Sequence, residues 1–577
     1  MNITNPVKMF NMKNTNPCEN DNKTLGMDQA CFTVFNNNNV PISLYSANEE
    51  CYFKLCDCLP WANVSANSNS SLVVSTRYPL HFYFVKGEYQ WCHDGFHFQE
   101  YGHYGWNLSE EHICSSVYTI TEPGNPYLPL LAAFMIFVIG AIIIGTTRFF
   151  IQMIKKFRTR NSLDDQSDTG PLQDSDSPAQ TLVRITKASI RVRSIDTFRG
   201  IAVLLMIFVN NGGGKYVFFN HSPWYGLTVA DLVLPWFAWI MGLTIVLSVR
   251  SQLRLSIPRS RIIMKSLKRA LILILLGLII NGHQGTKLSD LRFAGVLQLL
   301  GITYFICAGI ETLTMQAQRN FHYGRFAFLQ DILDAWIQWL IILTLTAIHL
   351  LLTFLLPVPG CPKGYFGPGG NSYHKRYYNC TGGVAGYIDR FIFGNHIYNK
   401  TTNSIYGDVL PHDPEGIMNT LSAVLIVALG VQAGRILFCY YLHNFSKIIR
   451  WFCWAVVLGL IAGFLCNWSK EGVIPISKNM MTISFVLTTS SFAFILFAIL
   501  YFLIDHHRIW AGAPFTYAGA NAIFLYMGHY FTIQSFPWTW TIDNPTHASL
   551  FAINLWTTVL WTLIAYGLYQ KDIIISI

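Results

Sequence analysis

Three polar side chains at the edges of long apolar segments have the chemistry needed for acyl or proton transfer. Asn210 ends one apolar run, Asp231 begins the next, and His221 lies in the connection between them. Histidine exchanges protons between about pH 5 and 8, so His221 can act as a general base or as a nucleophile that accepts an acyl group. An asparagine amide can orient such an imidazole or donate to a developing oxyanion. We therefore interpret His221 and Asn210 as candidate catalytic residues and Asp231 as a candidate substrate-binding residue.

His529 is a further candidate, because it lies in the apolar run LYMGHYF with Asn521 on the same helical face. A histidine at a membrane edge is commonly a hydrogen-bonded interfacial residue, whereas polar residues inside a membrane segment are often functional. We expect His529 to line a substrate site together with Asp231. His349, in the run TAIHLLLTF, has no acid or amide side chain beside it and is interpreted as structural.

The elements that must position these residues are membrane helices. The 577 residues are 52% hydrophobic, 15% aromatic and 12% charged, and this charged share is about half that of a typical globular protein. Such a composition excludes a soluble cytosolic enzyme, a disordered regulator and a nucleic-acid-binding protein. The net charge of +9 is typical of a membrane protein with basic cytoplasmic loops. We predict a polytopic α-helical membrane protein with lipid as its surroundings.

A helix needs about 20 apolar residues to cross a bilayer, and the sequence contains eleven candidate spans. They are centred near residues 128–149, 197–211, 227–248, 270–283, 295–312, 333–356, 416–437, 450–467, 481–504, 514–533 and 550–569. The connection from Arg250 to Arg269 carries Lys and Arg but no acid, and basic residues also follow the first and seventh spans. The positive-inside rule makes this side cytoplasmic, so the N-terminus is lumenal and the C-terminus is cytoplasmic.

These boundaries give a predicted domain organisation. Residues 1–126 form a lumenal N-terminal domain, 127–150 the first transmembrane helix, and 151–194 a basic, disordered cytoplasmic linker. Residues 195–577 form a ten-helix catalytic membrane domain with a lumenal loop at 357–415. Because Met1–Asp28 has no apolar stretch typical of a signal peptide, either a cleaved leader precedes this chain or the first span alone directs translocation.

N-glycosylation acceptors and cysteines agree with this orientation. We expect glycans on acceptors that fall on the predicted lumenal side: Asn63, Asn69, Asn107, Asn379 and Asn399. Asn444 also begins an acceptor motif but lies in a basic connection, so we expect it to be unmodified.

Cysteines crowd the same side, which indicates an oxidising compartment. They are Cys18, Cys31, Cys51, Cys56, Cys58, Cys92, Cys114, Cys361 and Cys380. The set lacks the paired CxxC spacing of a zinc site, so we expect disulfides and no metal. We predict a small β-rich N-terminal domain tied by disulfides, with strands near Ser71–Ser75 and His81–Val85. We also expect a disulfide to hold the loop around Cys361 and Cys380, either between them or to the N-terminal domain.

The membrane portion resembles a known family. The run from Ser194 to Gly242, which contains FVNNGGGKY and NHSPWYGLTVADLV, is similar to the heparan-α-glucosaminide N-acetyltransferases, lysosomal enzymes that acetylate terminal glucosamine of heparan sulfate. The resemblance continues through LRFAGVLQLLGITYF, LLPVPGCPKGYFGPGG, YYNCTGGVAGYIDR, DPEGIMNTLSAVLIVALGVQAG and NAIFLYMGH. It covers the chain from residue 190 to residue 570.

The resemblance implies site residues. The family's active-site histidine and asparagine fall on His221 and Asn210, and its RIPGV-like arginine falls on Arg292, within RFAGV. We expect Arg292 to contact substrate. The family's Gln-Arg pair after this motif is Gln298 and Leu299 here, which removes a cation at position 299.

The resemblance also implies the substrates. Acetyl-CoA is the cytosolic donor and terminal glucosamine is the lumenal acceptor, which must meet inside the membrane domain of a lysosomal, homodimeric protein. We expect Arg269 and Lys571, at the cytoplasmic ends of their helices, to contact the phosphates of acetyl-CoA.

Two mechanisms stay open at this point: His221 takes the acetyl group and hands it on, or it removes a proton from the amine while both substrates are bound. We favour direct transfer, since no hydrolysis-prone acyl-histidine then has to survive beside water. A proton-coupled transporter of a small sugar or anion, and an acyltransferase for another lumenal acceptor, are the competing functions. The absence of an apparent internal repeat argues against a transporter built from duplicated halves.

Overall fold

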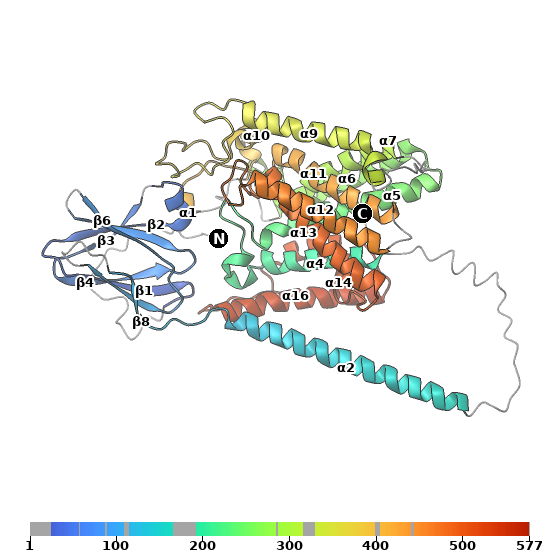
Figure 1. Ribbon diagram of the computed structural model, residues 1–577, viewed down its shortest axis with the longest axis horizontal. Coiled ribbons are helices and arrows are strands. Elements are labelled where there is room, and N and C mark those ends of the chain that lie inside the picture. The colour runs from blue at the N-terminus through green and yellow to red at the C-terminus, as the bar shows by residue number, and fades with distance from the viewer. Residues whose placement is uncertain are drawn as a thin grey trace, which may run out of the picture. The chain divides into compact units, whose positions relative to one another are not determined.

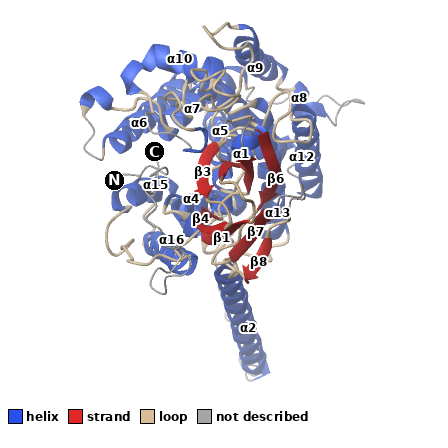
Figure 2. Cartoon of the chain, turned by 90° about the vertical axis from the view of Figure 1, so that its left-hand side faces the viewer, coloured by secondary structure: helices blue, strands red, loops and turns tan. Residues whose placement is uncertain are grey.

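The N-terminal region folds into two four-stranded β-sheets. This computed structural model describes residues 25–56, 58–86, 89–108, 115–164, 192–283, 287–315, 329–398, 404–439 and 444–575. One sheet has the strand order β4-β1-β7-β8 and the other β3-β2-β5-β6, and both are red in Figure 2. The strands are β1 (Gln29–Asn36), β2 (Ile42–Asn48), β3 (Leu59–Val64), β4 (Ser68–Ser75), β5 (Leu80–Lys86), β6 (Tyr89–Phe96), β7 (His103–Leu108) and β8 (Tyr118–Thr121).

Aromatic side chains fill the space between these sheets. The ring of Phe32 on β1 lies 5.4 Å from that of Phe82 on β5 and 5.0 Å from that of Phe98. Phe82 and Phe84 alternate along β5 with less buried residues, as expected for a strand with one face in a core. The prediction of a β-rich, disulfide-tied region is confirmed, and a disulfide joins Cys51 to Cys56 at the end of helix α1 (Glu49–Phe53).

Most of the remaining described residues lie in helices (Figure 1). The helices are α2 (Leu128–Asp164), α4 (Arg193–Asn210), α5 (Val233–Arg254), α6 (Arg259–Gly282), α7 (Val296–Thr314), α8 (Gln330–Leu333), α9 (Trp336–Leu355), α10 (Gly383–Phe393), α11 (Ile417–Cys439), α12 (Asn444–Leu465), α13 (Ile483–Tyr501), α14 (Phe515–Ala520), α15 (Ala522–Thr532) and α16 (His547–Gln570). A short 3₁₀ turn, Ala230–Leu232, precedes α5.

The described residues contain eight helices that are long and apolar enough to cross a membrane. A polytopic membrane protein is therefore confirmed, but the predicted number of eleven spans is not. Helix α4 carries Asp196 and Arg199 within its length, and α6 begins in the basic segment at Arg259. The tenth predicted span is broken into α14 and α15 at Asn521, whose side chain donates to the carbonyl of Ile573 and accepts from the amide of Ile575.

Glycines let the helices that carry the candidate site approach their neighbours closely. A Cβ on Gly242 of α5 would lie 2.0 Å from the carbonyl oxygen of Val427 on α11. A Cβ on Gly200 of α4 would lie 1.8 Å from the carbonyl oxygen of Phe515 on α14. Small residues permit such backbone contact between membrane helices, so α4 and α5 are fixed against α14 and α11.

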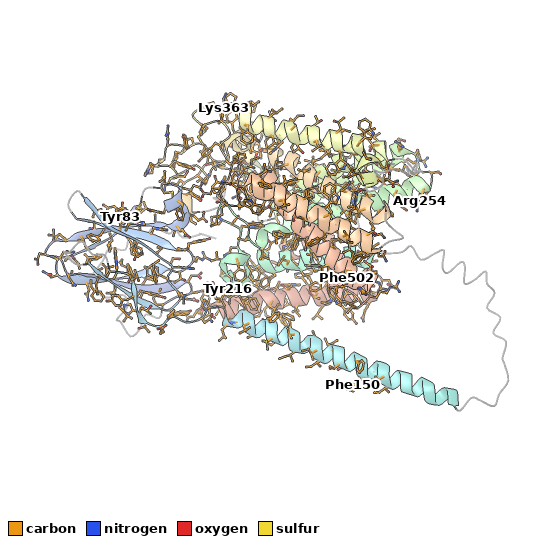
Figure 3. All side chains as sticks on the ribbon, in the orientation of Figure 1. Tyr83, Phe150, Tyr216, Arg254, Lys363 and Phe502 are labelled. Atoms are coloured by element: carbon orange, nitrogen blue, oxygen red, sulfur yellow. A yellow bond between two sulfur atoms is a disulfide. The ribbon has the colours of Figure 1, made fainter. Side chains whose placement is uncertain are left out.

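Helix α2 belongs to a separate compact unit, Gly124–Val192, and the other unit comprises Met1–Pro123 and Arg193–Ile577. Large apolar side chains of α2 are exposed, and Phe150 is one of them (Figure 3). The helix continues to Asp164, beyond the predicted end of the first span at residue 150. The remainder of the predicted linker, residues 165–191, lies outside the described residues.

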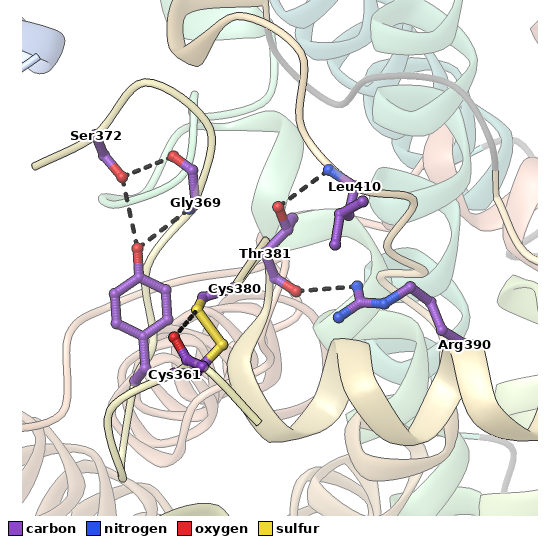
Figure 4. The surroundings of a disulfide bond; sticks show 9 residues. Cys361, Gly369, Ser372, Cys380, Thr381, Arg390 and Leu410 are labelled. Carbon is purple, nitrogen blue, oxygen red and sulfur yellow. Dashed lines mark hydrogen bonds between the residues drawn. A yellow bond between two sulfur atoms is a disulfide. The ribbon is translucent and has the colours of Figure 1, made fainter. Parts of the chain in front are cut away.

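The connection between α9 and α11 is crosslinked by a disulfide between Cys361 and Cys380 (Figure 4). This is one of the two arrangements expected for these cysteines. Next to the disulfide, Thr381 accepts hydrogen bonds from Arg390 of α10 at its carbonyl oxygen, 3.2 Å, and from the amide of Leu410 at its hydroxyl, 3.1 Å. The crosslink and these bonds hold α10 to the segment that leads into α11.

Candidate active site

His221 and Asp231 form a hydrogen-bonded pair in the connection between α4 and α5. The Nδ1 atom of His221 lies 2.7 Å from Oδ1 of Asp231. The carboxylate is fully buried, whereas half of the histidine side chain (51%) is exposed. A carboxylate bound to Nδ1 holds the proton on that nitrogen, which leaves Nε2 as the proton-accepting atom. The arrangement matches the base and orienting group of an acyl-transfer site.

Local backbone chemistry fixes the carboxylate of Asp231. Its Oδ2 accepts hydrogen bonds from the amide of Ser222 (3.1 Å), the amide of Thr228 (3.2 Å) and the hydroxyl of Thr228 (3.0 Å). Thr228 and Asp231 have the spacing of a helix N-terminal capping motif. These bonds hold the carboxylate in the orientation in which its Oδ1 meets Nδ1 of His221.

Asn210 contacts the other candidate histidine. It is the last residue of α4, and its Nδ2 lies 3.1 Å from Nε2 of His529 on α15. The Nδ1 of His529 lies 2.6 Å from the carbonyl oxygen of Tyr526, so Nδ1 carries the proton and Nε2 accepts from the amide. Nδ2 of Asn210 also lies 3.5 Å from the hydroxyl of Tyr530.

Four of the predicted site residues thus form two pairs, Asn210 with His529 and His221 with Asp231. Within the residues that the structure describes, no hydrogen bond joins His221 to Asn210. The segment between them contains Gly212, Gly213 and Gly214, which all have positive φ, and such backbone favours glycine.

Lys478 contacts His221, and the sequence did not predict it. Its Nζ lies 3.2 Å from Nδ1 and 3.3 Å from Nε2 of His221. Lys478 lies in the connection between α12 and α13, far from His221 along the chain. Nothing in the local sequence indicates this contact, because it depends on how two distant connections pack.

Arg292 lies in a buried cluster of charges. Its guanidinium donates to both carboxylate oxygens of Asp413 and to Oε2 of Glu415, and it lies over the ring of Tyr398. Burial alone would lower the pKa of Arg292, but the carboxylates of Glu415 and Asp413 outweigh it and raise that pKa. These contacts tie the segment before α7 to the segment before α11. The guanidinium that we expected to contact substrate is therefore bound by carboxylates of the protein itself.

The two residues expected at the donor phosphates have different surroundings. Arg269 lies over the ring of Tyr304, 4.7 Å from its centre, and its Nε is buried without a hydrogen-bond partner among the described residues. Lys571 is exposed at the end of α16. No hydrogen bond or ion pair joins the two in the described part of the chain.

Four of the five expected glycosylation sites lie on accessible surface. The side chains of Asn63, Asn69, Asn107 and Asn379 are exposed, and Asn399 lies outside the described residues. The side chain of Asn444 instead accepts a hydrogen bond from the hydroxyl of Tyr501, 3.0 Å. Among the residues described, no group of three or more His, Cys, Asp or Glu side chains is arranged to hold a metal ion.

Two curated proteins align with nearly the whole chain. The heparan-alpha-glucosaminide N-acetyltransferase of Homo sapiens is 38% identical over 587 residues, which cover 95% of this chain and 88% of that protein. The Mus musculus protein of the same name is 37% identical over 593 residues, 96% of this chain and 90% of that protein. No protein-family model matches the chain. Because the identity extends through both the β-rich region and the helical region, the chain belongs to the heparan-alpha-glucosaminide N-acetyltransferase family.

Proposed function

We propose that the protein transfers the acetyl group of cytosolic acetyl-CoA to the amine of terminal glucosamine of heparan sulfate, in the lysosomal lumen. The name of both relatives gives this reaction class. The observation that carries the proposal is the His221–Asp231 pair, at 2.7 Å, on a segment where half of the histidine side chain is accessible.

His221 is the proton acceptor in this proposal. Asp231 holds the proton on Nδ1 and stabilises the imidazolium that forms when Nε2 takes a proton from the glucosamine amine. The neutral amine nitrogen attacks the thioester carbonyl carbon as Nε2 takes this proton, so the N–C bond forms, the C–S bond breaks, and the product nitrogen keeps one hydrogen as an amide. His221 returns its proton to the departing thiolate, which leaves as the CoA thiol. Direct transfer of this kind needs no acetyl-histidine.

Asn210 is the oxyanion donor. His529 accepts one N–H of the Asn210 amide at 3.1 Å and thereby sets which end of the amide carries hydrogen. The second N–H of Asn210, whose nitrogen lies 3.5 Å from the hydroxyl of Tyr530, turns from that hydroxyl to the thioester oxygen as negative charge develops there. Removing one such donor typically costs about 10²–10³ in rate.

The orientation follows from charge. The basic segment from Arg250 to Arg269 faces the cytosol under the positive-inside rule, and Arg269 and Lys571 contact the phosphates of the donor. The N-terminal β-sheets and the loop with Cys361 and Cys380 face the lumen, as disulfides require. The protein acts as a glycosylated homodimer.

The test uses the purified full-length protein in detergent. Acetyl-CoA is supplied with and without glucosamine, and free CoA thiol and N-acetylglucosamine are measured. We expect thiol release that depends on glucosamine, and its loss in His221→Ala. A protein that moves labelled sugar or anion into liposomes without consuming thioester would instead be a transporter, and the proposal would be wrong.

A further inference from the structure

Lys478 is presented to His221 by a firmly held piece of backbone. The flanking residues Ser477 and Asn479 are buried. The amide of Ser477 donates to the hydroxyl of Thr482 at 3.2 Å, and the carbonyl oxygen of Asn479 lies 2.7 Å from both Nε2 of His412 and Nδ2 of Asn419. The position of the Lys478 backbone is therefore set by the α11 and α13 ends rather than by its own side chain.

Two other lysines, one in the α12–α13 connection and one bound to it, have carboxylate partners, whereas no carboxylate among the described residues is a hydrogen-bond partner of Lys478. Lys470 forms an ion pair with Glu50 at 2.9 Å, and Lys54 pairs with Glu471 at 2.8 Å. The Nζ of Lys478 instead contacts the two ring nitrogens of His221, a neutral acceptor when Nδ1 carries its proton. The nearby carboxylate of Asp231 is already bound by four donors from His221, Ser222 and Thr228.

The Lys478 ammonium also occupies the position that an amine substrate requires. A base accepts a proton across about 2.6–3.2 Å, and Nζ lies 3.3 Å from Nε2 of His221. An incoming glucosamine amine must therefore displace Nζ. A displaced ammonium at a partly buried site needs a new acceptor, and a charged oxygen is a stronger one than imidazole.

We propose that Lys478 is a specificity-determining residue, which leaves His221 when the acceptor binds and pairs with an oxyanion of that acceptor, a carboxylate or a sulfate. The proposal rests on the proposed function, in which the acceptor is an acidic glycan whose terminal amino sugar is joined to a uronic acid. When the Lys478 ammonium moves from His221 to the oxyanion, Nε2 of His221 becomes accessible. Binding of an acidic acceptor therefore makes the base available to the amine of that acceptor.

The experiment compares acceptors with and without negative charge. Full-length protein in detergent is given acetyl-CoA and one of three acceptors: methyl glucosaminide, its 6-sulfated form, or an unsulfated glucosaminyl-uronate disaccharide. The two anionic acceptors distinguish sulfate from carboxylate. The variants are Lys478→Gln, Lys478→Arg and, as a matched control, Lys470→Gln.

We expect Lys478→Gln to lower the ratio of kcat/KM for an anionic acceptor to kcat/KM for methyl glucosaminide by about tenfold or more, as loss of a hydrogen bond to a charged group does. The loss should lie in KM, should shrink at high salt, and should be largely restored by Lys478→Arg. Lys470→Gln should leave the ratio unchanged. Turnover of methyl glucosaminide reports that each variant is folded.

An unchanged ratio in Lys478→Gln would overturn the proposal. Equal loss with all three acceptors would also overturn it, since Lys478 would then serve only to position His221. Failure of the wild-type protein to acetylate any acceptor would refute the proposed function itself, and the two failures are therefore distinguishable.

Discussion

Asp389 should make the stability of the protein depend on pH. It lies on α10, is fully buried, and its Oδ1 accepts a hydrogen bond from the amide of Ile417 at 3.0 Å. Its Oδ2 is buried and has no hydrogen-bond partner among the described residues. Burial raises the pKa of Asp389 from 3.8 to about 7, and the charge of Asp413 adds to this.

The direction of the pH dependence follows from how many protons the folded and unfolded states bind. Between pH 4 and pH 7 the folded protein keeps a proton on Asp389 that the unfolded chain has released, so folding is increasingly penalised as pH rises. With the two pKa values above, the penalty is about 2 kcal/mol at pH 5 and about 4 kcal/mol at pH 7. Acidification from pH 7 to pH 5 should therefore return about 2 kcal/mol of stability through this group.

The assay is thermal unfolding in detergent, followed by tryptophan fluorescence at pH 5 and pH 7. Asp389→Asn keeps the shape but cannot ionise, so it should be more stable than wild type at pH 7, with a smaller advantage at pH 5. Burial lowers the pKa of His412, which acts in the opposite direction, so the comparison between variant and wild type is the informative quantity. Asp543→Asn, at an exposed acid, is the control.

The reasoning would be refuted if Asp389→Asn were no more stable than wild type at pH 7. A gain of equal size at both pH values would also contradict it, because the gain would then come from packing rather than from ionisation.

Three further predictions concern the site and the surface. His221→Ala should reduce kcat by about 10²–10⁴, and Asp231→Asn should reduce it less; normal turnover of His221→Ala at saturating substrate would exclude it as the base. Asn210→Ala should lose about 10²–10³ in kcat with little change in the KM for glucosamine, and a change confined to KM would indicate a binding role instead. Peptide mass spectrometry should find a glycan on Asn379 and none on Asn444, whereas a glycan on Asn444 would reverse the proposed orientation.

The sequence predicted those strands and helices that are determined by patterns within a few consecutive residues. The strand-like patches at Ser71–Ser75 and His81–Val85 lie in β4 and β5, because alternation and β-branched or aromatic residues act within one strand. The predicted count of eleven spans is not confirmed, because the other three predicted spans are charged or interrupted helices. The tenth predicted span is interrupted at Asn521, whose side chain bonds to the backbone of Ile573 and Ile575. Hydropathy averaged along the sequence does not reveal that contact.

The same distinction applies to the site. His221 and Asp231 lie in one short connection, so their proximity could be inferred from the sequence. The partners of Arg292, which are Asp413 and Glu415, come from the segment before α11, and Lys478 reaches His221 from the segment before α13. Such pairs are produced by packing between distant connections, and residue type alone does not reveal them.

The two candidate histidines differ in what their ring nitrogens can still do. His529 is 1% exposed, and both its nitrogens are engaged, Nδ1 with the carbonyl of Tyr526 and Nε2 with the amide of Asn210. His221 is half exposed, and among the described residues the one hydrogen-bond partner of its Nε2 is the side chain of Lys478. A general base needs a free lone pair that a substrate can reach. The geometry therefore favours His221 as the group that exchanges protons and His529 as the group that orients Asn210.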